Sequence, residues 1–308
     1  MRAVRSSKAA LDVCGLITAA ILFAVAAELH PPTQNVFLGI ATSFIFLSIL
    51  DVLLVTQKGI LNRARTKFFG SELIHEKATF VYPDFEPHRE VRRALDGAGI
   101  KMRYQRPTSK IRALGDFWID APNSAASNDI EAILHVASIF GGLAAQPDAM
   151  MSDRRLIEAC DRSYVSFGLA SSACTYLYLE RAGQESLFDL VPEYAGIKAR
   201  MFARTSDGRE FHSDNHNQYG LIVRYSPDRE RSPGRRWFFI GGLGPQGTIG
   251  AAWYLTEHWR TIARRVPASQ DFVAFVCVPV IAPRSAYLDD ADICTSTFRS
   301  ARSAVAAP

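Results

Sequence analysis

The chain opens with two long apolar segments that are separated by a short polar loop. Residues 9–27 and 36–55 contain almost no charged side chains. At about 1.5 Å rise per residue, a helix of this length spans about 30 Å, the thickness of the hydrocarbon core of a bilayer. The pattern predicts a two-helix transmembrane hairpin as an anchor over residues 1–67. A secretory signal peptide in the first segment and a buried helical hairpin are the alternatives.

Basic residues predict the orientation of this hairpin, because Lys and Arg beside membrane spans stay on the cytoplasmic side. The loop between the segments has neither residue type. The basic residues lie outside both segments, at Arg2, Arg5, Lys8, Lys58, Arg63, Arg65 and Lys67. We therefore expect two spans in the inner (plasma) membrane, with the N- and C-termini in the cytoplasm and the lipid bilayer as a partner.

The rest of the chain alternates between short β-rich runs and helical patterns. Residues 68–296 are long enough for one large core, and the alternation predicts the α/β class, with a Rossmann-like sheet between helices. The predicted strands are 79–82, 116–120, 163–167, 219–225, 235–240 and 272–280. The predicted helices are 86–98, 128–140, 174–181 and 249–265. Residues 297–308, rich in Ser and Ala, are predicted to be a disordered tail.

The helix expected at 128–140 has a clear start signal. Asn128 is the predicted cap, with Glu131 three residues later. The apolar stripe is predicted to comprise Ile130, Ile133, Leu134, Ala137 and Phe140. His135 lies off that stripe, so it is interpreted as solvated rather than as a ligand.

Composition narrows the classes of function. The formal charge of +4 is modest and much of the basic excess flanks the membrane segments, so no nucleic-acid partner is expected. The five cysteines form no C-x-x-C pair, which argues against a disulfide framework and against a structural zinc site. Hydrolase, kinase and zincin functions lack their motifs: G-x-S-x-G, the P-loop and H-E-x-x-H.

Two segments share a strand, turn and helix layout that suits an anionic ligand. The first runs through Gly168, Ser171 and Ser172, and the second through Gly242, Gly244, Gly247 and Thr248. The first N–H groups of a helix have no partner within the helix, so such a turn is an anion site. If both turns lie at the carboxyl edge of one parallel sheet, they flank a single crevice. The pattern predicts a phosphate-bearing ligand, a nucleotide or a dinucleotide.

The spacing of Gly242, Gly244 and Gly247 matches the dinucleotide fingerprint G-x-G-x-x-G in the correct strand-to-helix context. The match is incomplete, because the following strand does not end in an acid and Pro245 interrupts the turn. A ligand-contacting turn, a full NAD-type dehydrogenase site and a purely structural glycine turn all remain open.

A second candidate chemistry lies just before the predicted hairpin of 219–225 and 235–240. In an extended chain, His212, Asp214 and His216 would share one side and could hold zinc. The favoured interpretation is a hydrated loop without a metal, because a further ligand cluster is missing and Asn215 and Asn217 are turn formers.

The segments 165–180 and 219–255, placed behind two membrane spans, resemble membrane-tethered Rossmann-like modules of bacterial conflict systems, of the TIR-like and SLOG-like kind. The resemblance implies sensors or effectors that bind nucleotides or nucleotide-derived signals at the two turns. Some members cleave the glycosidic bond of NAD, which requires a carboxylate, and Glu180 is the nearest acid on the first helix.

We therefore expect a membrane-anchored, cytoplasmic nucleotide-binding sensor or effector, in the setting of bacterial defence signalling. The alternatives are a nucleotide-processing enzyme, either an NAD glycohydrolase or an NAD(P)-dependent oxidoreductase, and a protein-binding scaffold. Small residues in the spans, Gly15, Ala19, Gly39 and Ser43, would permit helix contacts, so a homo-oligomer is also open.

Overall fold

The computed structural model divides the chain into two compact units, Met1–Arg65 and Thr66–Pro308. The structure describes residues 17–28, 31–76, 78–84, 93–94, 96–98, 101–103, 118–120, 125–141, 149–157, 161–195 and 198–296. Most of the helix expected at 86–98 and all of the expected tail at 297–308 lie outside these residues.

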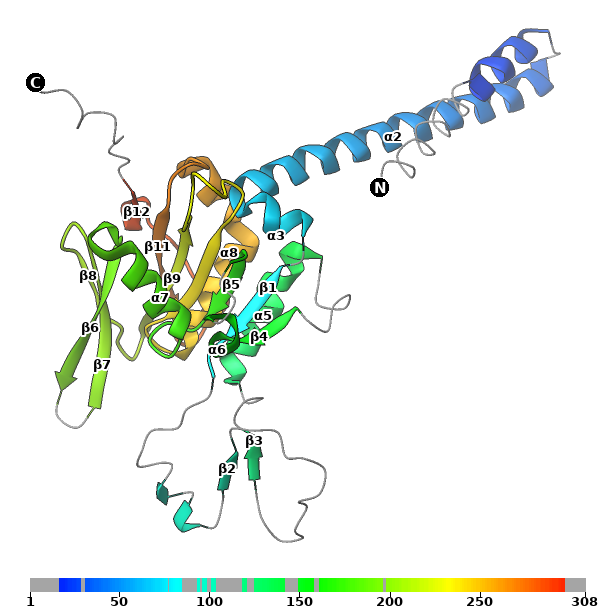
Figure 1. The fold of residues 1–308 in the computed structure, drawn as a ribbon. Coiled ribbons are helices and arrows are strands. Elements are labelled where there is room, and N and C mark those ends of the chain that lie inside the picture. The colour runs from blue at the N-terminus through cyan, green and yellow to red at the C-terminus, as the bar shows by residue number, and fades with distance from the viewer. Residues whose placement is uncertain are drawn as a thin grey trace, which may run out of the picture. The chain divides into compact units, whose positions relative to one another are not determined.

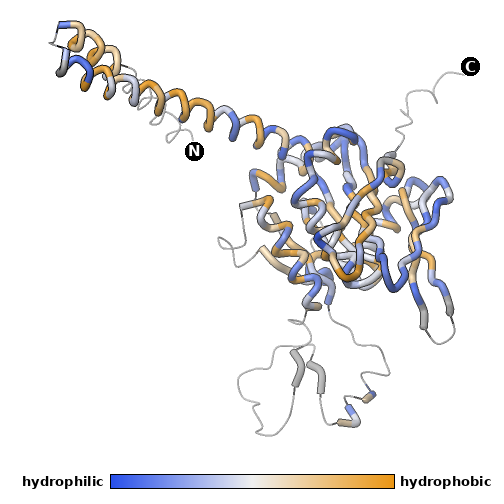
Figure 2. Tube along the Cα trace, turned by 180° about the vertical axis from the view of Figure 1, so that it is seen from behind, coloured by the Kyte–Doolittle hydropathy of each residue, from blue (hydrophilic) through white to orange (hydrophobic). Residues whose placement is uncertain are grey.

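Among the described residues of the N-terminal region, one helix is long and apolar enough to cross a membrane. Helix α2 covers Pro31–Phe69, and its candidate span is Thr33–Phe69, 37 residues. Figure 2 shows its hydrophobic stretch in orange. The first expected span is represented by the shorter apolar helix Ile17–Ala27, and residues 9–16 lie outside the described part of the chain. A two-span hairpin is therefore not shown.

The second unit is a mixed α/β domain built on a seven-stranded sheet in the order β12-β11-β9-β10-β5-β1-β4 (Figure 1). Strands β4, β1, β5 and β10 are mutually parallel, and β9 runs antiparallel between β10 and β11. The strands of this sheet are β1 (Thr79–Tyr82), β4 (Met150–Ser152), β5 (Tyr164–Phe167), β9 (Asn217–Tyr225), β10 (Trp237–Gly242), β11 (Phe272–Pro279) and β12 (Ile293–Thr295).

Two smaller sheets accompany it. Strands β6 (Phe188–Ala195), β7 (Lys198–Thr205) and β8 (Glu210–Phe211) form an antiparallel sheet that the sequence pattern did not predict. Strands β2 (Lys101–Arg103) and β3 (Trp118–Asp120) pair in parallel. The predicted antiparallel hairpin of 219–225 and 235–240 is confirmed as β9 and β10.

Helices lie on both faces of the large sheet (Figure 1). On one face, α8 (Pro245–Arg265) packs against β9, β10 and β11, and α5 (Ser127–Ala137) packs beside it. On the other face, α6 (Asp153–Ile157), α7 (Ala173–Ala182) and the small β6–β8 sheet share a core with Trp237 and Phe239. The remaining short helices are α3 (Ser71–His75), η2 (Ser138–Phe140), η4 (Gly183–Glu185), η5 (Pro283–Ser285) and η6 (Asp290–Asp292).

Two predictions for α5 are wrong: the residue that caps it and the set of residues that forms its buried face. The helix begins at Ser127 after Ala126, and no side chain caps it, so Asn128 is not the cap. Leu134, expected on the apolar stripe, is 59% exposed. The buried face is formed by Asp129, Ala132, Ile133, Val136 and Ala137. The buried face of α5 is therefore rotated from the predicted one. Packing against α8 and the sheet decides which face is buried, and the number of apolar side chains on a face does not.

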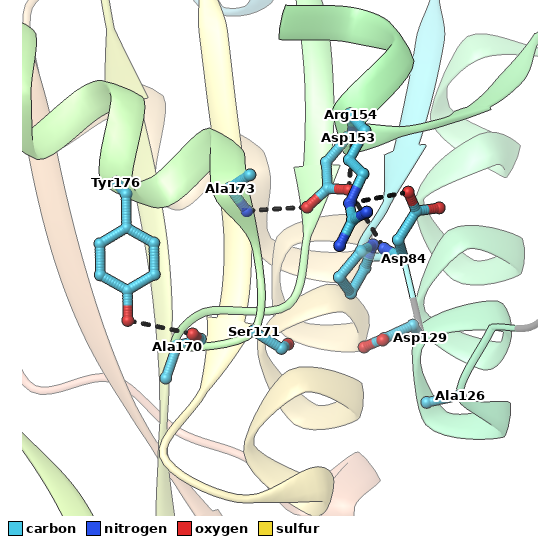
Figure 3. Close-up of a pocket in the computed structure, with 10 residues that line it drawn as sticks. Asp84, Ala126, Asp129, Asp153, Arg154, Ala170, Ser171, Ala173 and Tyr176 are labelled. Carbon is cyan, nitrogen blue, oxygen red and sulfur yellow. Dashed lines mark hydrogen bonds and ion pairs between the residues drawn. The ribbon is translucent and has the colours of Figure 1, made fainter. Parts of the chain in front are cut away.

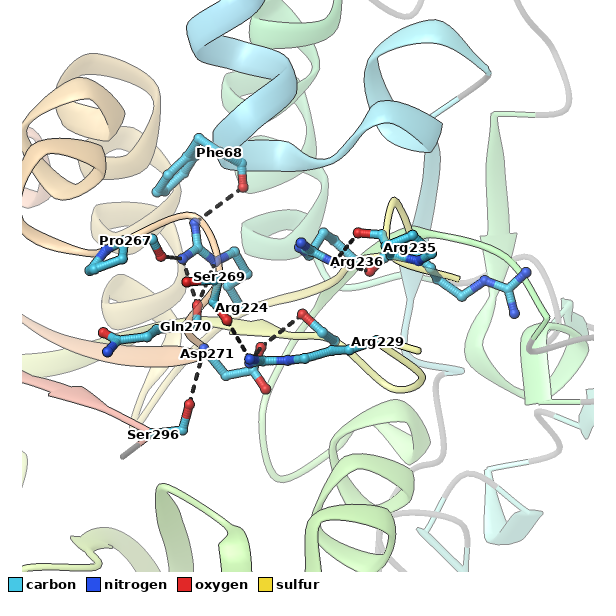
Figure 4. Close-up of polar contacts among 12 residues, drawn as sticks. Phe68, Arg224, Arg229, Arg235, Arg236, Pro267, Ser269, Gln270, Asp271 and Ser296 are labelled. Atoms are coloured by element: carbon cyan, nitrogen blue, oxygen red, sulfur yellow. Dashed lines mark hydrogen bonds and ion pairs between the residues drawn. The ribbon is translucent and has the colours of Figure 1, made fainter. Parts of the chain in front are cut away.

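A buried guanidinium joins the last turn of α2 to the sheet (Figure 4). Arg224 of β9 is fully buried and donates to the carbonyl oxygens of Phe68 (3.3 Å), Pro267 (2.6 Å) and Gln270 (2.6 and 3.2 Å). Its carbon Cζ lies 5.1 Å from the ring centroid of Phe68 and 4.9 Å from that of Phe272, within cation–π range. Backbone carbonyls and ring faces thus compensate for the lost hydration of this charge.

Burial lowers the pKa of Arg224 to about 10, and the like charge of Arg236 acts in the same direction. The side chain therefore remains charged at neutral pH. Phe68 and Phe69 continue the same core, because their rings pack against Phe238 and Trp259. The end of α2 is thus an integral part of the α/β unit.

We predict that Arg224→Met lowers the free energy of unfolding by about 3 kcal/mol or more, because three buried carbonyl groups lose their donors. Chemical unfolding of the full chain in detergent, followed by tryptophan fluorescence, measures this change. The control is Arg264→Met on the exposed end of α8, expected to change stability by less than about 0.5 kcal/mol. Equal effects of the two substitutions would contradict the structural role of Arg224.

Candidate functional site

The two glycine turns leave the same edge of the sheet from neighbouring strands. Strands β5 and β10 pair in parallel, with Phe167 opposite Ile240. Gly168, just after β5, has φ of 79°, and a Cβ there would lie 3.0 Å from Pro83 Cγ and 3.1 Å from Ser171 Oγ. Both turns therefore lie at one carboxyl edge of the sheet, and the first turn also lies against Pro83, just after β1.

The donors of the first turn are largely used by the chain itself. The Ala173 N–H, at the start of α7, donates to Asp153 Oδ2 at 2.7 Å. Ser172 is fully buried, and its Oγ lies 3.1 Å from Ser166 Oγ. Ser171 is exposed. Of the hydroxyls expected to bind an anion here, only that of Ser171 faces open space.

The second turn is occupied by a glutamine side chain. Helix α8 begins at Pro245, four residues before the predicted Ile249, and the Oε1 of Gln218 accepts the N–H groups of Gln246 (2.9 Å) and Gly247 (3.1 Å). Gly244 has φ of 140°, and a Cβ on it would lie 2.4 Å from the Gln218 amide carbon. A phosphate at this helix end would have to displace Gln218.

The other members of the fingerprint are packed against the sheet. A Cβ on Gly242 would lie 2.5 Å from the carbonyl carbon of Gly247, and one on Gly247 would lie 2.6 Å from the Tyr219 oxygen. Thr248 is buried. In this structure the spacing of these glycines therefore serves the close packing of α8 on β9 and β10.

A cavity of about 530 Å³ opens at the carboxyl edge of β4, β1 and β5 (Figure 3). Segments from four places in the sequence line it: the end of β1, the start of α5, the start of α6, and the turn from β5 into α7. Its polar lining residues are Asp84, Asp129, Asp153, Arg154, Ser171 and Tyr176. Of the predicted site residues, only Ser171 lines this cavity.

Asp153 holds the walls of the cavity together. Its Oδ1 accepts the N–H groups of Asp84 (3.1 Å) and Arg154 (2.9 Å), and its Oδ2 accepts that of Ala173. The residue is 2% exposed. A carboxylate with three backbone donors is fully engaged, so Asp153 is a structural member of the site.

Asp84 has one engaged and one unengaged oxygen. Its Oδ2 lies 3.4 Å from Arg154 Nε, while its Oδ1 is buried without a hydrogen-bond partner among the described residues. Burial, followed by the charge of Asp153, raises the pKa of the Asp84 carboxyl.

Asp129 is a deeply buried acceptor that faces the cavity and lacks a strong hydrogen bond. The residue is only 4% exposed, and its carboxylate points toward Ser171 (Figure 3). Within the described part of the chain, its one side-chain hydrogen bond comes from Asn128 Nδ2, at a long 3.4 Å. Burial raises the pKa of Asp129 to about 6. A carboxyl with this pKa can exchange a proton near neutral pH.

Sequence reasoning missed Asp129, Asp84 and Asp153. The sequence does contain one indication of the site. Asp129 lies on the same helical face as Ala132, Ile133 and Val136, and this face is recognised as the buried one once the orientation of α5 is known. An acid on a buried helical face is uncommon without a partner and marks a candidate site.

The other candidates from the sequence lie elsewhere. Glu180 is exposed on α7 and does not line the cavity. His212 stacks on Phe202, with ring centroids 4.3 Å apart, and its Nε2 lies 3.1 Å from Glu210 Oε2. Asp214 accepts the N–H groups of Asn217 and His216, which lower its pKa. Among the residues that the structure describes, no group of three His, Cys, Asp or Glu is placed to hold a metal ion.

Comparison with known proteins adds no relative. No protein-family model matches the chain, and neither the curated proteins nor the solved structures give a significant match.

We predict that Gln218→Ala lowers the free energy of unfolding by about 1 to 2 kcal/mol, because the first N–H groups of α8 lose their acceptor. The exposed Gln184 serves as control, and Gln184→Ala should leave stability within about 0.5 kcal/mol of the wild type. Thermal unfolding of the full chain gives both values. A wild-type melting temperature in the Gln218 variant would exclude the capping role.

We predict that Asp129→Asn stabilises the protein above pH 6 by about 2 to 3 kcal/mol, because the wild type must keep a buried carboxylate ionised there. The pKa of Asp129 is raised in the folded state to about 6, so the folded state binds the proton more tightly. Wild-type stability should then fall as pH rises from 4 to 6 and level off above.

Unfolding measured at pH 4, 5, 6, 7 and 8 tests this dependence. The advantage of the Asp129→Asn variant should vanish near pH 4, where Asp129 of the wild type is protonated. Asp161, a highly exposed acid, provides the control substitution Asp161→Asn, which should show no such trend. A difference between Asp129→Asn and wild type that is constant with pH would contradict the raised pKa.

Proposed function

We propose that the protein is a membrane-anchored sensor or effector whose α/β domain binds a nucleotide-type small molecule in the cavity beside Asp129. The observation that carries this proposal is the buried carboxylate of Asp129, directed into a cavity at the carboxyl edge of parallel strands. Open α/β sheets bind ligands at this edge. A buried acceptor without a close donor is also costly unless a ligand supplies one.

The size and lining of the cavity suit such a ligand. About 530 Å³ lies within the common range of small-molecule pockets, about 300 to 1,000 Å³. The ring of Tyr176, a residue that is 52% exposed, lies at its rim and offers a stacking surface for a base. Arg154 and the Ser171 hydroxyl supply donors for polar groups at the same rim.

The membrane part of the proposal rests on the N-terminal sequence. The long apolar helix Thr33–Phe69 supports one span, and the apolar run from residue 9 supports a second. The basic residues on the outer flanks support cytoplasmic termini in the inner membrane. The resemblance to Rossmann-like modules of bacterial conflict systems supports a role in defence signalling.

A specific observation also favours a second candidate, a nucleotide-processing enzyme. An enzyme requires a general acid or base in the cavity, and Asp129, with a pKa of about 6, meets that requirement. The two candidates differ in the fate of the ligand. A sensor releases it intact, whereas an enzyme releases a product.

We predict that Ala170→Phe, which fills the rim of the cavity, weakens nucleotide binding by at least about tenfold, whereas Ala282→Phe, on the exposed segment before η5, does not. Melting temperature of the full chain in detergent is measured against NAD, ADP-ribose and cyclic nucleotides. A ligand at 100 times its Kd adds about 2.7 kcal/mol of stability.

Chromatography of the ligand after incubation separates sensor from enzyme. Recovery of intact ligand indicates a sensor, and a product that is lost in Asp129→Asn indicates an enzyme. Stabilisation by no nucleotide, or equal stabilisation of both phenylalanine variants, would refute binding in this cavity.

A further inference from the structure

We propose that the nucleoside end of the ligand, with its hydroxyl and amino groups, enters the cavity and donates hydrogen bonds to Asp129, while the phosphate stays outside. This inference rests on the proposed function and assigns the chemistry of the same cavity. It reverses the arrangement expected from the glycine fingerprint, in which the phosphate binds at the turns.

The charge of the cavity disfavours an anion. Three carboxylates, from Asp84, Asp129 and Asp153, line the cavity together with one guanidinium, from Arg154. Arg154 already lies 3.4 Å from Asp84. A phosphate inside would face an excess of negative charge in a partly desolvated space, where like charges repel strongly.

The deeply buried group of the cavity that lacks a close donor is an acceptor, the Asp129 carboxylate, whereas the donors of Arg154 and Ser171 lie at the rim. Asp129 lines the cavity and, among the described residues, its side chain receives only the long 3.4 Å bond from Asn128 Nδ2. Such an acceptor is satisfied by O–H and N–H donors, which ribose and the amino groups of the bases provide. A phosphate group, by contrast, offers mainly acceptor oxygens and negative charge at neutral pH.

The helix ends that would attract a phosphate are already capped from within. Asp153 accepts the Ala173 N–H at the start of α7, and Gln218 accepts the first N–H groups of α8. An acid and an amide thus replace the anion that a free helix N-terminus binds. These N–H groups are therefore satisfied at both turns without a phosphate.

Other titratable groups are near enough to be considered in a pH test. Asp84, Asp153 and Arg154 face the cavity from β1 and α6. Glu131 and His135 are on α5 itself, and the charges of Arg284 in η5 and Glu257 in α8 act on His135. The variant Asp129→Asn, measured beside the wild type, isolates the contribution of Asp129 from these groups.

The test uses the full chain in detergent micelles and isothermal titration calorimetry. The probes are the four ribonucleosides, their 2′,3′-dideoxy forms, ADP-ribose and inorganic phosphate. We expect at least one ribonucleoside to bind, its dideoxy form to bind about tenfold more weakly, and phosphate neither to bind nor to compete. Affinity for the ribonucleoside should rise from pH 5 to pH 7, as Asp129 ionises.

In Asp129→Asn the preference for the ribonucleoside should fall to less than about threefold and lose its pH dependence. Asp161→Asn should behave as the wild type. An unchanged preference in Asp129→Asn, or competition by phosphate, would overturn the inference. Binding of ADP-ribose but of no nucleoside would also overturn it and leave the proposed function standing, whereas binding of neither class would refute both.

Discussion

The site depends on one carboxylate. Asp153 accepts backbone N–H groups from the end of β1, from α6 and from the start of α7, and so fixes three segments that are far apart in the sequence. Because these hydrogen bonds involve backbone groups, they set the course of the chain itself. The same contact places negative charge where a free helix end would attract an anion. Asp153 thus shapes the cavity and contributes to its negative charge.

A second buried charge, that of Arg224, binds backbone groups of separate segments where α2 leads into the α/β unit. Arg224 satisfies three backbone carbonyls, one of them at Phe68 in the last turn of α2. The aromatic side chains around it, Phe68 and Phe272, belong to the core of the α/β unit. The sheet therefore carries two polar anchors, one at the cavity and one at the entry of the chain into the domain.

Local patterns predicted five strands of the large sheet but missed β4, β12 and the β6–β8 sheet, and they were insufficient for the site. The strands at 79–82 and 163–167 and the hairpin of β9 and β10 follow from runs of β-branched and aromatic residues, which are properties of neighbouring positions. The caps of α7 and α8 come from Asp153 and Gln218, 20 and 28 residues away from the amides they bind. No local spacing encodes such partners. The glycine spacing predicted an open anion site because Gln218, which occupies the second turn, is distant in the sequence and is not part of the local pattern.

The central claim is that the ligand occupies the cavity of Asp129 with its donor groups inward. A structure of the full chain with a bound nucleotide tests it most directly. The account predicts a ribose hydroxyl or a base amino group within about 3 Å of the Asp129 carboxylate, with Gln218 still on α8. A phosphate seated at Gly244, with the Gln218 side chain displaced, would contradict it.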